Sequence, residues 1–130
     1  MTTGKTLLII EDDTIQREML STELRQHGFT VVTAPEGNQA LNWLSSGLVP
    51  DLILLDMLLP SGERDGWWFL KERQRIPALA AVPVIIMTSL SVACAAWAAS
   101  LGAAGLLRKP FEADSALAEI RHCLGEAVQA

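Results

Sequence analysis

The residues of this sequence that could carry out chemistry lie at the ends of short apolar runs. Glu11 and Asp12 follow the first run, Asp56 ends the third, and Thr88 and Lys109 follow the last two. Carboxylate oxygens are ligands for hard divalent cations, and an aspartate can act as a nucleophile. A lysine ammonium can pair with a phosphate oxygen, and a threonine hydroxyl can donate to one. If these side chains meet in space, they suit phosphoryl transfer, which depends mainly on alignment and charge neutralisation.

The apolar runs are typical of β-strands, and a segment with helical spacing follows each one. The run 52–55 is too short for a helix and is apolar throughout, as in a strand covered on both faces of a parallel sheet. The first helix is expected from Asp13, as N-cap, to Gly28. Its apolar stripe is Ile15, Met19, Leu20 and Leu24. The expected strands are 6–10, 30–34, 52–56, 83–87 and 105–108, and the later helices are 36–46, 66–75, 91–101 and 112–128.

The strict alternation of strands and helices predicts one α/β domain. Its parallel sheet would be covered by helices on both faces and joined by right-handed crossovers. Parallel strands share one carboxyl edge, so Glu11 and Lys109 should lie close together although they are far apart in the sequence. A lone aspartate at a strand end usually caps a turn, and Asp13 is expected to act mainly as a helix cap. Asp56 differs because other polar strand ends accompany it.

The expected cluster of Glu11, Asp12 and Asp56 requires a cation. Carboxylates about 4 Å apart repel each other by about 4 kcal/mol per pair at an effective dielectric near 20. All-oxygen ligands with open positions favour Mg²⁺, with Mn²⁺ as a substitute. Lys109 can neutralise only part of the charge, and its ammonium group suits a phosphate oxygen.

Composition excludes several classes of function. The 130 residues suffice for one domain, and no window has the roughly 20 uncharged apolar residues of a membrane helix. A net charge of −5 provides no basic face, so direct nucleic-acid binding is not expected. Cys94 and Cys123 lack metal-ligand spacing, and a reduced, cytoplasmic setting is expected. The chain ends at Ala130, soon after the last expected helix, which fits either a separate domain or a piece of a longer protein.

Four motifs spaced along the chain resemble those of one protein family. They are Glu11-Asp12, Asp56-Met-Leu-Leu-Pro60, Thr88-Ser89 and Lys109-Pro110-Phe111. Together they resemble the receiver domain of two-component response regulators. The resemblance covers about 6–124 of a single domain that occupies 1–130. It implies a flavodoxin-like, doubly wound, five-stranded parallel sheet in the order 2-1-3-4-5, with five helices.

The resemblance also implies how a metal ion would be held. Asp12, Asp56 and the backbone carbonyl of Leu58 would bind Mg²⁺ directly. Glu11 would act through a water molecule. Every one of these ligands is an oxygen atom, as Mg²⁺ prefers.

The phosphoryl chemistry follows from the same resemblance. Asp56 would accept a phosphoryl group from a phosphohistidine of a sensor histidine kinase or phosphotransfer protein. Lys109 would pair with the phosphoryl oxygens, Thr88 would move to bond one of them, and the Lys109-Pro110 peptide would be cis. Such a domain catalyses its own phosphorylation and dephosphorylation, but it acts mainly as a switch for a partner-binding face.

Three features depart from the family pattern. Leu106 stands where receivers usually carry an aromatic switch residue, and the loop between Pro60 and Gly66 is longer than usual. The expected helix 91–101 is nearly uncharged. It fits either an ordinary alanine-lined surface or a contact face anchored by an exposed Trp97. In receivers this face commonly docks an effector or a second receiver, so self-association is a further expectation.

Other functions compete with this interpretation. A flavodoxin-type cofactor module shares the fold, but Glu11 and Asp12 would repel the phosphate of its cofactor. A phosphatase of the haloacid dehalogenase type needs a second acid two residues after the nucleophile, where this chain has Leu58. A receiver-like interaction module that works without phosphorylation is the remaining alternative. Leu106 favours that alternative, whereas the complete set of acids, threonine and lysine disfavours it.

Overall fold

A parallel sheet brings the separated motifs together. The computed structural model describes residues 4–57 and 66–125, and its strands run parallel in the order β2-β1-β3-β4-β5. The strands are β1 (Thr6–Ile10), β2 (Thr30–Ala34), β3 (Leu52–Asp56), β4 (Val84–Thr88) and β5 (Gly105–Arg108). The doubly wound, flavodoxin-like fold and the strand order are therefore confirmed. Four of the strands have the expected bounds, and β4 is shifted by one residue.

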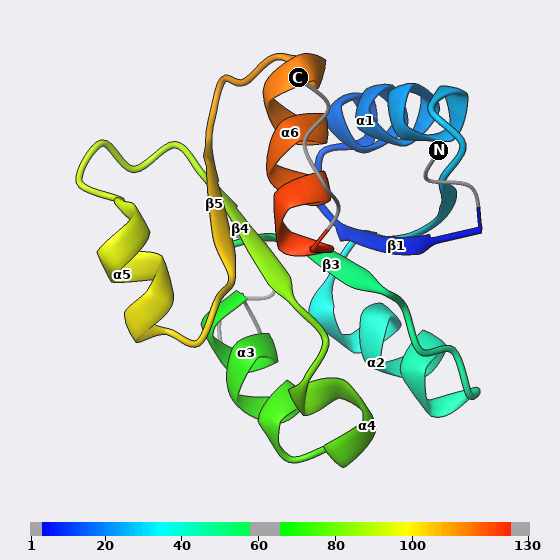
Figure 1. Ribbon diagram of the computed structural model, residues 1–130. Coiled ribbons are helices and arrows are strands. Elements are labelled where there is room, and N and C mark those ends of the chain that lie inside the picture. Colours follow the sequence, from blue (N-terminus) through cyan, green and yellow to red (C-terminus); the bar gives the residue numbers. More distant parts are fainter. Residues whose placement is uncertain (1–3, 58–65, 126–130) are drawn as a thin grey trace.

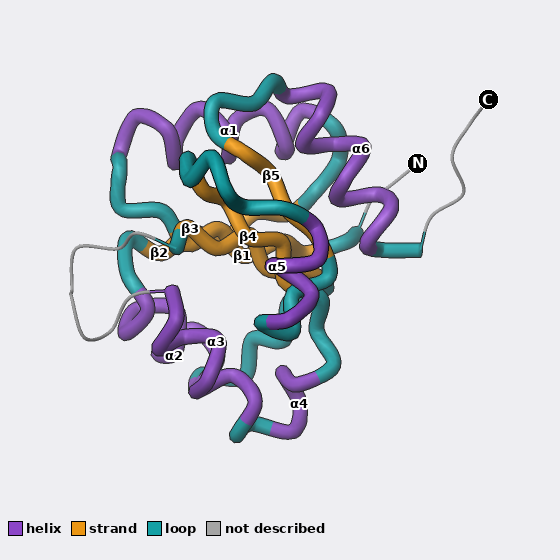
Figure 2. The backbone as a smooth tube through the Cα atoms, turned by 90° about the vertical axis from the view of Figure 1, so that its left-hand side faces the viewer, coloured by secondary structure: helices purple, strands orange, loops and turns teal. Residues whose placement is uncertain are grey.

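Helices cover both faces of the sheet. They are α1 (Thr14–Gln26), α2 (Gly37–Ser45), α3 (Gly66–Gln74), α4 (Pro77–Ala80), α5 (Ala95–Ser100) and α6 (Ala113–Cys123). Figure 2 shows α1 and α6 on one face of the sheet and α2, α3 and α4 on the other. In Figure 1, α5 lies beside the edge strand β5. None of the described helices is both long and apolar enough to span a membrane.

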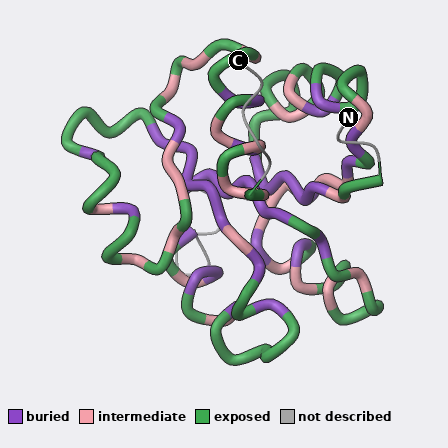
Figure 3. Tube along the Cα trace, in the orientation of Figure 1, coloured by how far each residue is buried: buried purple, intermediate pink, exposed green. Residues whose placement is uncertain are grey.

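The two faces of the sheet carry separate hydrophobic cores. Leu8 and Ile53 point into the core under α2, α3 and α5, whereas their neighbours Leu7 and Leu52 point into the core under α1 and α6. This division follows from the alternation of side chains along a strand. Every residue of β3 and β4 is buried, and Figure 3 shows this buried centre between exposed helix surfaces. The apolar run 52–55 therefore has the two-sided burial expected of it.

The described residues form six helices, one more than expected. The additional helix α4 has Pro77 at its start, where the missing N–H of a proline costs nothing. The buried side chain of Arg73 holds this turn, because Nη2 donates to the carbonyls of Ala80 and Val82 at 3.2 and 2.7 Å. So short a helix leaves no periodic signal in the sequence.

Helix α5 begins later than expected. The segment 91–94 forms a turn and an extended residue, and Cys94 has φ −144° and ψ 170°. The Arg108 guanidinium donates a hydrogen bond to the carbonyl of Ala93, in the segment just before α5. The range 91–101 expected for the helix was wrong at its start, because a side chain from β5 holds the preceding loop.

The aromatic residue expected to anchor an exposed face is only partly exposed. Trp97 packs against the core, and its ring meets that of Trp67 edge to face, with centroids 5.8 Å apart and an interplanar angle of 80°. Edge-to-face contact is a favoured arrangement of aromatic rings. Of the two alternatives for this helix, the contact face anchored by an exposed Trp97 is therefore not what the structure shows. Val92, in the loop before α5, is the strongly exposed apolar residue nearby, at 82%.

The apolar stripe expected on α1 was also partly wrong. Leu24 is buried and Leu20 half-buried, but Ile15 and Met19 are 71% and 66% exposed. Ile15 and Leu24 are nine positions apart, which is about 180° around a helix of 3.6 residues per turn. The four residues form two pairs on opposite sides of α1, and one pair faces solvent.

Candidate functional site

The polar strand ends lie along one edge of the sheet. Asp56 is the last residue of β3, and its register partner in β4 is Met87, directly before Thr88. Glu11 continues the line of β1, since its N–H donates to the Ala34 carbonyl of β2 at 3.0 Å. Lys109 continues β5, since its N–H donates to the Thr88 carbonyl at 2.7 Å. The sheet register therefore brings the four motifs together.

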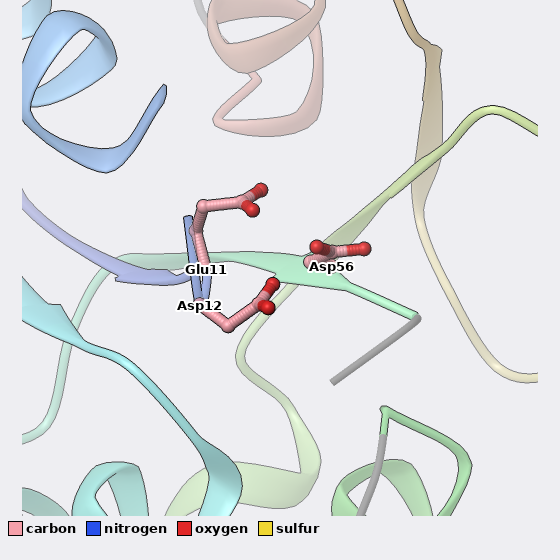
Figure 4. A group of neighbouring side chains, drawn as sticks. All are labelled: Glu11, Asp12 and Asp56. Carbon is pink, nitrogen blue, oxygen red and sulfur yellow. The ribbon is translucent and has the colours of Figure 1, made fainter. Parts of the chain in front are cut away.

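Three carboxylates converge at this edge. Figure 4 shows Glu11 and Asp12, after β1, with carboxylates directed toward the space beside Asp56. One oxygen from each residue lies within 4.8 Å of the others. Glu11 and Asp56 are buried, with 3% and 5% exposure, whereas Asp12 is exposed. Solvent can therefore reach the cluster from the side of Asp12.

Lys109 is the cation that faces this cluster. Its Nζ lies 2.6 Å from Glu11 Oε2 and 3.4 Å from Asp56 Oδ2. One ammonium group thus bridges two buried carboxylates and leaves the cluster with excess negative charge. The Lys109-Pro110 peptide bond is cis, as the resemblance implied.

The pKa values of Glu11 and Lys109 are both shifted by burial and by the neighbouring charges. Burial raises the pKa of Glu11 to about 7; the hydrogen bond from Lys109 opposes this, and the Asp56 charge adds to it. Burial alone would lower the pKa of Lys109, but its hydrogen bond to Glu11 and the charges of Asp56 and Glu11 raise it. Glu11 therefore keeps its proton to a higher pH than an exposed glutamate does.

Thr88 is held beside the acids but is bonded within its own loop. It is 1% exposed, and its Oγ1 accepts a hydrogen bond from the Leu90 N–H at 3.2 Å. A hydroxyl can rotate and exchange partners at low cost. Leu106, on the neighbouring strand β5, is half-buried and packs against the core.

An open cavity of about 520 Å³ leads to the cluster. Its lining combines polar groups of the site with apolar side chains from α1 and the segment after β5. The lining residues are Gln16, Met19, Asp56, Ser89, Lys109, Pro110 and Phe111. The buried Asp56 is therefore accessible from outside through this cavity.

The structure brings together Glu11, Asp12, Asp56 and Lys109, and it places Thr88 at the end of β4 with its carbonyl bonded to the Lys109 N–H; all five were expected from the sequence. Leu58, whose carbonyl was expected to bind metal, lies outside the described residues, as does the whole loop between Pro60 and Gly66.

Sequence reasoning missed two residues that shape the site. Arg17 of α1 reaches back to the loop that carries the acids, and its Nη1 donates to the Glu11 carbonyl at 2.8 Å. Gly66, at the start of α3, packs directly against the end of β3. Arg17 has no distinguishing sequence signal, because exposed arginines are common on helices. Gly66 was expected only as the start of the helix 66–75.

The donor set fits Mg²⁺. All candidate ligand atoms of Glu11, Asp12 and Asp56 are carboxylate oxygens, and one of the three residues is exposed. Hard oxygen ligands with room for water molecules are what Mg²⁺ prefers. A divalent ion there would offset the repulsion that Lys109 leaves uncompensated.

The raised pKa of Glu11 predicts a pH-dependent stability. Between its ordinary value of 4.5 and about 7, the folded protein keeps the Glu11 proton that the unfolded chain releases. The free energy of unfolding of the metal-free protein should fall across this range by on the order of 2 to 3 kcal/mol. Urea unfolding followed against pH measures this loss. Glu11→Gln should lack most of the slope, and an equal slope in that variant would contradict the assignment.

Comparisons with known proteins agree with this geometry. The family model of the response regulator receiver domain matches residues 7–121. The probable transcriptional regulator ycf27 of Guillardia theta is 34% identical over 123 residues, which cover 94% of this chain and 46% of that protein. The chain spans about half or less of the length of the curated relatives it matches.

Solved structures share the fold. The chemotaxis response regulator CheY4 of Vibrio cholerae has a TM-score of 0.83 and 25% identity, over 93% of this chain and 99% of that one. The receiver domain of a sensor histidine kinase from Pseudomonas aeruginosa has a TM-score of 0.83 over 95% of this chain and 100% of that one. At 24% identity, this likeness shows the shared fold alone. The structure of that protein holds a magnesium ion in the active-site cleft. The family match over residues 7–121 and the relative at 34% identity show that the chain belongs to the receiver domains of response regulators.

Proposed function

We propose that this receiver accepts a phosphoryl group on Asp56 and uses the modified state to control a partner. The observation that carries the proposal is the grouping of Glu11, Asp12 and Asp56 within 4.8 Å, with Lys109 Nζ 2.6 and 3.4 Å from two of them. A structural role alone does not require this concentration of charge, because buried like charges destabilise a fold. A phosphoacceptor needs all four groups.

Each residue has a role in this reaction. An Asp56 carboxylate oxygen attacks the phosphorus and forms a P–O bond. The bond between the phosphorus and the nitrogen of the donor histidine breaks, and the imidazole leaves with the electron pair of that bond. Lys109 lies 3.4 Å from Asp56 Oδ2, where its ammonium can pair with an oxygen of the incoming group. Thr88 can exchange its loop hydrogen bond for a bond to another phosphoryl oxygen.

We propose Mg²⁺ as the cofactor. Asp12, Asp56 and the carbonyl of Leu58 would bind it directly, and Glu11 would bind through water. When bound, the ion neutralises negative charge on the reacting oxygens and fixes their alignment. The exposed Asp12 gives it a route from solvent.

The phosphoryl donor is proposed to be a sensor histidine kinase or a phosphotransfer protein. The cavity beside Asp56 opens next to Met19, and both Met19 and Ile15 expose large apolar side chains. Apolar groups beside a polar reactive centre are typical of a docking surface. The acidic chain with its free Cys94 and Cys123 is proposed to work in the cytoplasm.

The output is proposed to pass through the face formed by the loop before α5, α5 itself and β5. Movement of Thr88 would release the Leu90 N–H and so affect the loop that carries Val92. Attachment of the phosphoryl group would shift an existing equilibrium of this loop, with an effector or a second receiver as the partner. Leu106 replaces the usual aromatic residue here, so a module that binds partners without phosphorylation is the second candidate.

Transfer of label from a phosphorylated histidine kinase tests the proposed function. The parent chain should take up label in the presence of Mg²⁺, and Asp56→Asn should take up none. Met19→Ala should slow transfer from the kinase but leave uptake from acetyl phosphate unchanged, because a small donor needs no docking surface. Equal labelling of the parent and Asp56→Asn would refute the assignment of the nucleophile.

A further inference from the structure

Arg17 contacts the backbone of the loop that carries two of the acids. Its Nη1 donates to the Glu11 carbonyl at 2.8 Å and makes a longer contact of 3.4 Å with the Asp12 carbonyl. Among the described residues, the ion pairs within 4 Å do not include Arg17. Helix α1 begins beside three carboxylates, yet the guanidinium of its Arg17 donates hydrogen bonds to neutral carbonyl groups.

These two carbonyls determine the conformation of Asp12. The Glu11 carbonyl belongs to the peptide group before Asp12, and the Asp12 carbonyl belongs to the one after it. Peptide groups are planar, so their rotations about the Asp12 Cα are its φ and ψ. By holding both groups, Arg17 fixes the direction in which the Asp12 side chain leaves the backbone.

Asp12 has particular need of such support. It is exposed, unlike Glu11 and Asp56, so neighbouring side chains do not hold it by packing. Its carboxylate is repelled by two others within 4.8 Å. The helix cap acts on the next residue, where Asp13 Oδ1 accepts from the Gln16 N–H at 2.9 Å. The peptide group after Asp12 is also held by the Asp13 N–H, which donates to Glu11 Oε1 at 3.2 Å. The peptide group before Asp12 depends on Arg17 for a side-chain contact to its carbonyl, and without that contact repulsion would favour turning Asp12 toward solvent.

We propose that Arg17 is a positioning residue for the metal site, which holds the backbone on both sides of Asp12 so that its carboxylate is ready to bind Mg²⁺. This inference rests on the proposed function, since it assigns a metal to the cluster. Preorganisation strengthens binding because the ligand need not be ordered when the ion arrives. The positive charge of Arg17 acts in the opposite direction, because it repels a cation.

The two effects of Arg17 can be separated by substitution. Both contacts come from one guanidinium nitrogen, Nη1. Arg17→Met removes the charge and the donors, whereas Arg17→Lys keeps the charge on a strongly hydrated ammonium group with a flexible stem, in place of a planar guanidinium. Arg75→Met is the matched control, because the Arg75 side chain is 78% exposed and forms an ion pair with Glu72 on α3. It changes the net charge by the same amount away from the acids.

Calorimetric titration of the whole chain with Mg²⁺ tests the inference. Both Arg17 variants should bind Mg²⁺ on the order of tenfold more weakly than the parent, as for other residues that orient metal ligands. Arg75→Met should bind as the parent does. The melting temperatures of the metal-free Arg17 variants should fall by only a few degrees, since each variant loses one partly buried hydrogen bond to the Glu11 carbonyl.

The dependence of phosphorylation on Mg²⁺ provides a second measurement. With acetyl phosphate as donor, the Mg²⁺ concentration for half-maximal rate should rise in both Arg17 variants by the same factor as the dissociation constant. The rate at saturating Mg²⁺ should recover, because Arg17 touches no reacting atom.

Several results would overturn the inference. Parent-like affinity in Arg17→Lys with tighter binding in Arg17→Met would mean that Arg17 acts through charge alone. Parent-like affinity in both variants would exclude any role. If the parent binds Mg²⁺ but takes up no phosphoryl group at any Mg²⁺ concentration, the proposed function fails while the affinities still decide the role of Arg17. A parent that binds no Mg²⁺ would overturn both.

Discussion

Asp12→Asn is expected to weaken Mg²⁺ binding by about a hundredfold or more, because a neutral amide replaces a carboxylate proposed to bind the ion directly, and even the loss of a residue that only orients a metal ligand costs about 10- to 100-fold. Asp12 is the exposed member of the cluster, so its loss should disturb the fold little. Removal of one of three mutually repelling carboxylates should even stabilise the metal-free protein slightly. Calorimetric titration with Mg²⁺ and thermal unfolding without it measure both effects.

The neighbouring acid provides the control for Asp12→Asn. Asp13→Asn removes the same charge one residue further along, where Oδ1 accepts from the Gln16 N–H at 2.9 Å. Asparagine caps a helix about as well as aspartate does, so this variant should keep its fold. It should also keep most of its Mg²⁺ affinity. Equal losses in the two variants would indicate that only the overall negative field attracts the ion.

Gly66→Ala is expected to destabilise the protein by about 3 kcal/mol or more, at or above the upper end for overpacked cores. A Cβ at Gly66 would lie 2.7 Å from Met57 Cα, 2.9 Å from Met57 Sδ and 3.0 Å from the Asp56 carbonyl oxygen. The Met57 side chain could move aside, but the backbone at the end of β3 could not move without displacing Asp56. Urea unfolding would give the loss of stability, and Mg²⁺ titration would show the displacement of Asp56.

Gly47→Ala separates this contact from the conformational preference of glycine. Gly47 has φ 102°, and a Cβ there would meet nothing within 4 Å. The substitution should therefore cost only the left-handed backbone conformation, about 1 to 2 kcal/mol. A loss in Gly66→Ala no greater than that in Gly47→Ala would contradict the close packing of α3 on the end of β3.

The sheet and the cluster could be predicted because their signals are local or fixed by topology. The run 52–55 is apolar on every residue, which is the pattern of a strand buried on both faces. Once the strands are parallel, Glu11, Asp56 and Lys109 must meet at one edge. The positions of the strands in the sequence were sufficient to predict this cluster, because the carboxyl ends of parallel strands lie side by side.

The features that were missed depend on contacts between elements. The start of α5 follows from the hydrogen bond of Arg108 to the Ala93 carbonyl, which no periodicity reveals. The partial burial of Trp97 follows from its edge-to-face contact with Trp67 on α3. In each case a side chain from another element determines the local structure.

The exposed pair on α1 was missed for a different reason. Ile15 and Met19 fit a helical stripe, but the angular distance of Ile15 from Leu24 places that pair on the opposite side of the helix. The necessary information was in the sequence. An angular projection of α1 would have identified the apolar surface beside the cavity.

The central claim is that Asp56 is the phosphoacceptor and that Mg²⁺ supports its reaction. Intact-protein mass after incubation with acetyl phosphate and Mg²⁺, for the parent chain and Asp56→Asn, tests this most directly. The account predicts a gain of one phosphoryl group in the parent, none in Asp56→Asn, and none in the parent when the metal is chelated. A parent chain that gains no mass under conditions in which it binds Mg²⁺, or an equal gain in Asp56→Asn, would contradict it.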